Sequence, residues 1–188
     1  MSDTSRSIMA LTALGAGLVH LAVGAGSPLA AAVGLCALGL VELVWGLAVL
    51  SRGRTLLPTA MLIGSLAPVA LWGLLVTVRV TGGASGLTDF LPLGPLAAAS
   101  ALNLATALFL ARERRSRGTE PAAESPSAQP ARPGRYLLGM VLGAMAVAGV
   151  VTPALAATNA GTYAVPHGEH GTAPTESNLD LPGTHSGH

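Results

Sequence analysis

A single carboxylate, Glu42, interrupts an apolar run that extends from Leu29 to Leu50. If this run crosses a bilayer, a charged side chain near its middle costs at least about 2.5–3.5 kcal/mol, so Glu42 is expected to face protein or water and not lipid. A carboxyl group in this position could carry a proton or bind a cation. It could equally be a protonated acid that only hydrogen-bonds a neighbouring helix, and both interpretations stay open.

His20 and Asn103 are the polar residues that the sequence offers to Glu42. The short turn at 24–28 makes the segments of His20 and Glu42 an antiparallel pair. At 1.5 Å per residue, Glu42 lies about 20 Å from the turn end of its segment and His20 about 8–9 Å from the turn end of its own. This difference of roughly 10 Å in depth predicts a water-bridged relay and no tight ion pair. Asn103 could complete a polar interior or act only as an interhelical hydrogen-bond partner.

The end of the chain carries two H-x-x-H pairs, His167 with His170 and His185 with His188, and Glu169 lies within the first pair. Imidazole is a good ligand for Zn(II) and Cu(II), and a carboxylate can add an oxygen ligand. These five residues are therefore candidate ligands for a transition metal, Cu or Zn. Because the surrounding stretch is polar and rich in Gly, Pro and Thr, binding would have to order it. A solvated tail without metal is the alternative interpretation.

The segments that must hold Glu42, His20 and Asn103 are apolar. Of the 188 residues, 51% are hydrophobic and only 10% are charged. A soluble domain usually has about 25% charged residues, so this composition indicates a polytopic membrane protein. Each apolar segment has roughly 18–23 residues, enough to cross a hydrocarbon layer of about 30 Å. We predict an all-α integral membrane protein with five transmembrane helices, at 8–26, 29–50, 56–78, from 91 or 93 to 111, and 136–156.

Arginines gather between the fourth and fifth segments, at Arg112, Arg114, Arg115, Arg117, Arg132 and Arg135. Connections rich in arginine stay on the cytoplasmic side of a membrane, which predicts an N-terminus inside and a C-terminus outside. Arg6, Arg52 and Arg54 fall on the same predicted side.

The chain then divides into four parts. Residues 1–111 form a four-helix transmembrane region, and 112–135 form a cytoplasmic linker that is too poor in apolar residues to pack and is predicted to be disordered. Residues 136–156 form the fifth helix, and 157–188 form a flexible extracytoplasmic tail. The end of the fifth segment, Ala154-Leu155-Ala156, is similar to a signal-peptidase site, so release of the tail after Ala156 is an alternative.

Several classes of function have no support in the sequence. No basic patch is interleaved with aromatic residues, so no nucleic-acid partner is expected. The motifs of zinc proteases, redox dithiols, phosphate-binding loops and nucleophile elbows do not occur. We therefore expect a protein that is not an enzyme.

The first two segments carry a resemblance. The run Gly17-Leu-Val-His20-Leu-Ala-Val, followed by the turn Ser27-Pro28 and a Gly-rich second segment, resembles small multi-pass membrane proteins of unknown function from high-GC Gram-positive (actinobacterial) bacteria. Some of these have a His at this place and a His-rich C-terminal tail. They often have a second His in the turn, where this chain has Ser27-Pro28. The resemblance implies a bacterial plasma membrane location and no established activity.

Three functions remain open. The first is a non-enzymatic membrane protein that binds or senses a transition metal through its outer tail. The second is a structural or assembly subunit of a larger membrane complex. The third is a small proton-coupled transporter that uses Glu42, which as a five-helix protomer would need to form a homo-oligomer to enclose a path. In each case the lipid bilayer is the expected environment.

Overall fold

The computed structural model describes residues 2–82, 91–119 and 133–163. Within these ranges all regular secondary structure is helical, and five of the helices are long and apolar enough to cross a membrane. This confirms the predicted all-helical fold class and the number of candidate spans. The helices are α1 (Asp3–Ala25), α2 (Leu29–Arg52), α3 (Pro58–Val80), α4 (Leu93–Thr119) and α5 (Pro133–Ala156), followed by the short 3-10 helix η1 (Asn159–Tyr163).

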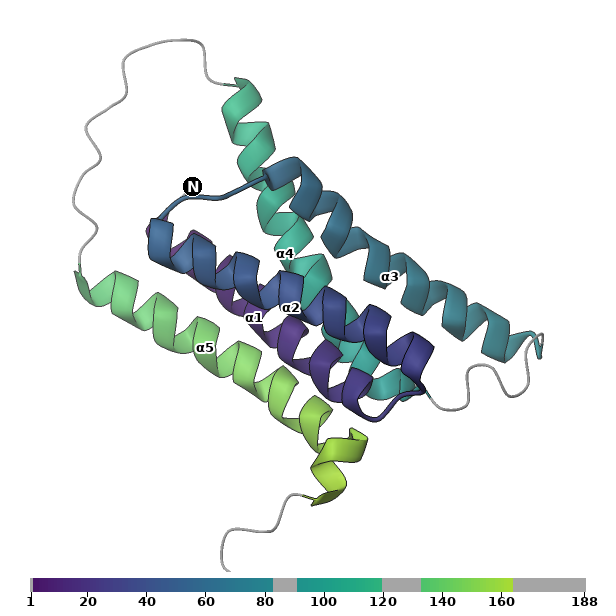
Figure 1. The fold of residues 1–188 in the computed structure, drawn as a ribbon. Coiled ribbons are helices and arrows are strands. Elements are labelled where there is room, and N and C mark those ends of the chain that lie inside the picture. The colour runs from purple at the N-terminus through teal and green to yellow at the C-terminus, as the bar shows by residue number, and fades with distance from the viewer. Residues whose placement is uncertain (1, 83–90, 120–132, 164–188) are drawn as a thin grey trace, which may run out of the picture.

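Helix α1 is the centre of the bundle and packs against α2, α4 and α5 (Figure 1). Its backbone comes very close to that of α2, because a Cβ added to Gly17 would lie only 2.7 Å from the carbonyl oxygen of Gly39. A Cβ added to Gly39 would lie equally close to the carbonyl oxygen of Gly17. Glycine is needed at both positions for the helices to approach this closely.

Helix α3 lies at the side of the bundle and packs against α4 (Figure 1). Along the described chain, no Cα atom of α3 comes within 8 Å of one in α2. The two helices are neighbours in sequence, but the link at 53–57 leaves them apart. A cavity lies between them, lined by residues of both helices.

The faces that protein does not cover are apolar. The apolar stretch of α1 is 61% buried within the protein, against only 17% for those of α3 and α5. On the outer faces, large side chains such as Val44, Leu74 and Leu142 are more than half exposed. Such faces would be unfavourable in water, whereas lipid would cover them without cost. The pattern supports a multi-pass membrane protein.

Both ends of the predicted linker, 112–135, are helical. Helix α4 continues past Ala111 to Thr119, and α5 already begins at Pro133. Arginine is a good helix former, and cations near a helix C-terminus interact favourably with the helix dipole. Glu113 anchors this extension, because its carboxylate accepts a hydrogen bond of 2.9 Å from the hydroxyl of Thr55. The middle of the linker, 120–132, lies outside the described residues.

The predicted flexible tail is also ordered where it begins. The short helix η1 packs against α1 and α5. Thr158 is buried, with its hydroxyl donating to the carbonyl oxygen of Leu155 at 2.7 Å. Asn159 lies against Gly26 in the turn between α1 and α2, where an added Cβ would come within 2.7 Å of it. This contact holds the start of the tail against the end of the bundle.

Candidate functional site

Three helices bring His20, Glu42 and Asn103 together in the interior of the bundle. His20 comes from α1, Glu42 from α2 and Asn103 from α4. All three residues are almost fully buried, with 1%, 3% and 1% of their surfaces exposed. The sequence suggested these residues as a polar interior, and the structure places them in direct contact.

The carboxyl group of Glu42 is hydrogen-bonded through both of its oxygens. Oε2 lies 2.7 Å from Nδ1 of His20, and Oε1 accepts a hydrogen bond of 2.8 Å from the side-chain amide of Asn103. Both partners come from other helices, so the group links α2 to α1 and to α4. A buried polar group of this kind is stable only when its hydrogen bonds are made, and here they are.

The prediction that His20 and Glu42 would not form a tight pair is wrong. It compared the depths of the two backbone positions and left out the directions of the side chains. In a helix the Cβ bonds tilt towards the N-terminus. Because α1 and α2 are antiparallel, the side chain of His20 tilts away from the turn and that of Glu42 tilts towards it. The two therefore converge, and the close approach of the helices at Gly17 and Gly39 completes the contact.

The hydrogen bonds determine where protons can reside. Asn103 donates to Oε1, and the contact between Oε2 and Nδ1 holds one proton. If the Glu42–His20 pair has no net charge, a second proton is on Nε2, whether the first belongs to the acid or to the imidazole. If the pair loses a proton, Nδ1–H donates to the carboxylate and Nε2 keeps a lone pair. Nε2 is thus the atom through which the pair gains or loses its proton.

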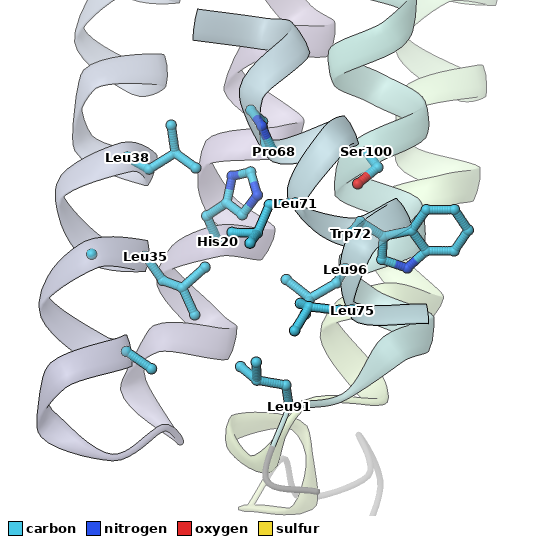
Figure 2. Close-up of a pocket in the computed structure, with 12 residues that line it drawn as sticks. His20, Leu35, Leu38, Pro68, Leu71, Trp72, Leu75, Leu91, Leu96 and Ser100 are labelled. Atoms are coloured by element: carbon cyan, nitrogen blue, oxygen red, sulfur yellow. The ribbon is translucent and has the colours of Figure 1, made fainter. Parts of the chain in front are cut away.

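His20 also lines a cavity of about 300 Å³ between α2 and α3 (Figure 2). The walls are apolar and include Gly34, Leu38, Leu71 and Trp72. Nδ1 is engaged with Glu42, whereas Nε2 has no hydrogen-bond partner among the residues that the structure describes. The ring therefore connects the buried carboxyl group on one side to the cavity on the other.

The sequence did not predict this cavity. Its walls come from α2, α3 and α4, and their residues are ordinary members of apolar helices. Besides His20, Ser100 of α4 is the lining residue that departs from this pattern. The indole N–H of Trp72 donates to the carbonyl oxygen of Leu93 at 3.3 Å, which fixes the ring as a wall. No local spacing in the sequence indicates that α2 and α3 stand apart.

The candidate metal ligands of the tail, His167, Glu169, His170, His185 and His188, lie outside the described residues. Within the described ranges, no group of three or more His, Cys, Asp or Glu side chains could hold a metal ion. Metal binding by the tail, with Cu or Zn, therefore stays a prediction.

Comparison with protein-family models, with curated proteins and with solved structures found no match to this chain. The class of the molecule consequently follows from its own features. It is an all-helical protein with five candidate membrane spans and a buried Glu–His–Asn site.

Proposed function

We propose that this chain is a multi-pass plasma-membrane protein that couples protonation of the Glu42–His20 pair to the binding or passage of a small molecule. The single observation that carries the proposal is that a buried, fully hydrogen-bonded carboxyl group contacts a histidine that opens onto a cavity. Ionisable residues within membrane spans commonly serve proton relays and transport pathways. The third of the three functions considered from the sequence is thus the one best supported.

The hydrogen bonds favour a proton over a metal cation as the species bound. Oε1 already accepts an N–H from Asn103, and a donor directed at the carboxyl group repels a cation placed there. Neither Glu42 nor His20 belongs to a larger group of ligands in the described chain. A proton needs no further ligands, and the contact between Oε2 and Nδ1 already has the geometry to share one.

The proposed orientation has the N-terminus inside and the C-terminus outside. The starts of α1 and α5, the end of α4 and the link from α2 to α3 lie towards one end of the bundle (Figure 1). Arg6 and Arg112 lie in these segments and Arg52 ends α2 beside the link, whereas Arg79 lies in the last turn of α3, at the other end of the bundle. An excess of arginine is typical of the cytoplasmic side.

A reporter fused after His188 tests the orientation. Alkaline phosphatase, which is active only outside the cytoplasm, is expected to be active at this position. Green fluorescent protein, whose export in unfolded form leaves it dark, is expected not to fluoresce there. The opposite pair of results would reverse the proposed orientation.

Infrared difference spectroscopy of the protein in lipid nanodiscs tests proton exchange. Between acidic and alkaline buffer, the wild-type difference spectrum is expected to contain a carboxyl band that belongs to Glu42, at the acid frequency if the shared proton is on the carboxyl group and at the carboxylate frequency if it is on the imidazole. Glu42→Gln should abolish this band, because an amide has no carboxyl group. The matched control is Glu113→Gln, which changes the other buried glutamate of the described chain and should leave the band unchanged. Identical difference spectra for the wild type and Glu42→Gln would contradict the proposal.

A further inference from the structure

The geometry points to a chemical class of ligand for the cavity between α2 and α3. We infer that it binds an uncharged lipophilic molecule with a hydrogen-bond acceptor, such as a carbonyl group, and that this acceptor is bound by Nε2–H of His20. The inference rests on the proposed function, because it takes the uncharged state of the Glu42–His20 pair as the state that meets the ligand.

The walls of the cavity select for an apolar, uncharged molecule. Apart from His20 and Ser100, the lining is built from hydrophobic residues, proline and glycine. No arginine or lysine lines it, so a phosphate or carboxylate would have no cation to pair with among the described residues. The volume of about 300 Å³ is at the small end of the range found for small-molecule sites.

His20 supplies the group that distinguishes one apolar molecule from another. The ligand is taken to meet the Glu42–His20 pair in its uncharged state. In that state Nε2 carries a proton, and no described residue accepts it. An N–H that faces an apolar cavity without an acceptor is unfavourable, so a ligand that supplies one gains a hydrogen bond. A ligand without an acceptor makes the same apolar contacts with the walls but gains no hydrogen bond.

The cavity is reached from the side of the bundle that faces lipid. The Cα atoms of α2 and α3 stay more than 8 Å apart along the described chain, and Leu71, which lines the cavity, is 52% exposed. Gly34 forms part of the α2 wall, and a Cβ added to it would meet no atom within 4 Å. A molecule dissolved in the bilayer can therefore enter between the two helices without crossing a polar surface.

Two probes of equal chain length test the inference on the full-length protein in nanodiscs. One is a terminally brominated straight-chain methyl ketone and the other is the corresponding brominated alkane. Bromine quenches tryptophan fluorescence on contact, and Trp72 lines the cavity. We expect half-maximal quenching at about fivefold lower membrane concentration for the ketone, which corresponds to one net hydrogen bond. Equal concentrations for the two probes would overturn the inference.

Variants locate the effect. Trp72→Phe should remove the part of the quenching that saturates with probe concentration, because that part comes from the indole that lines the cavity. Gly34→Phe places a bulky side chain at the exposed edge of the cavity and should weaken quenching by both probes, whereas Gly149→Phe, which makes the same change at another exposed site, on α5, with equal free space, should weaken neither. His20→Leu should leave quenching by the alkane and abolish the preference for the ketone. A ketone preference that survives in His20→Leu, or quenching that is undiminished in Gly34→Phe, would overturn the inference.

The outcome is separable from that of the proton proposal. A titrating Glu42 together with equal quenching by the two probes would overturn the ligand class and leave the proton site standing. A preference for the ketone, together with an infrared difference spectrum that contains no band from Glu42, would overturn the proton site and leave the ligand class standing. If His20→Leu does not fold, the comparison of the two probes on the wild type and on Gly34→Phe still decides the matter.

Discussion

Gly39→Ala is expected to destabilise the folded bundle by about 1–3 kcal/mol, the usual cost of forcing extra atoms into a packed interface. The new Cβ would lie 2.7 Å from the carbonyl oxygen of Gly17 and 3.0 Å from Cγ of Leu21. The carbonyl oxygen is part of a helix and cannot move aside alone, so α1 and α2 must separate. Separation would also lengthen the contact between His20 and Glu42, which lies close to this crossing.

Gly34→Ala is the matched control in the same helix. Its Cβ would meet no atom within 4 Å, and alanine is the better helix former by about 0.5–1 kcal/mol. Its stability should therefore equal or slightly exceed that of the wild type. Reversible unfolding in mixed micelles, followed by circular dichroism as denaturing detergent is added, measures both variants. Equal stabilities for Gly39→Ala and Gly34→Ala would contradict the close approach of α1 and α2.

Glu42→Ala is expected to cost about 2 kcal/mol of folding free energy. In a soluble protein, removing one partner of a buried charged pair can destabilise the fold by more, about 3–5 kcal/mol. The lower figure is used because interhelical hydrogen bonds in membranes average about 0.6 kcal/mol and reach about 1.7 kcal/mol. The change removes two such bonds, to His20 and to Asn103, and leaves a small void.

Glu42→Gln is the informative companion, because it keeps the shape of the side chain and can still accept from Asn103 and bond to His20. Its cost should stay below about 1 kcal/mol. The same unfolding measurement serves for both variants. If Glu42→Gln were as destabilising as Glu42→Ala, the charge or the acid proton of Glu42 would contribute more to the fold than its hydrogen bonds do. That result would contradict the present description of the site.

The spans could be predicted from the sequence because each depends on local hydropathy. The second helix begins at Leu29, where the prediction placed it, and the other boundaries agree to within about three residues, apart from the extensions of α1 back to Asp3 and of α4 on to Thr119. Those extensions are polar residues that continue a helix beyond its apolar part, as α4 does after Ala111. Hydropathy reports the apolar stretch and not the end of the helix.

The site was predictable in its members and not in its geometry. His20, Glu42 and Asn103 stand out because polar side chains are rare in apolar helices. Their contact depends on the tilt of side chains in antiparallel helices and on the approach at Gly17 and Gly39. The cavity depends on α3 packing against α4 and not against α2. Such a choice of neighbour is a tertiary property, and no spacing within α2 or α3 encodes it.

A double-mutant cycle between His20→Ala and Glu42→Ala tests the central claim most directly, because it isolates the energy of their contact. Residues in direct contact typically show a coupling of about 0.5–3 kcal/mol, and we expect about 1–2 kcal/mol here. The control cycle pairs His20→Ala with Glu113→Ala, whose site lies about 15 Å further along α4 than Asn103, and should be additive. A coupling between His20 and Glu42 of about 1–2 kcal/mol would support the bonded pair. Additivity within about 0.3–0.5 kcal/mol, as in the control cycle, would contradict it.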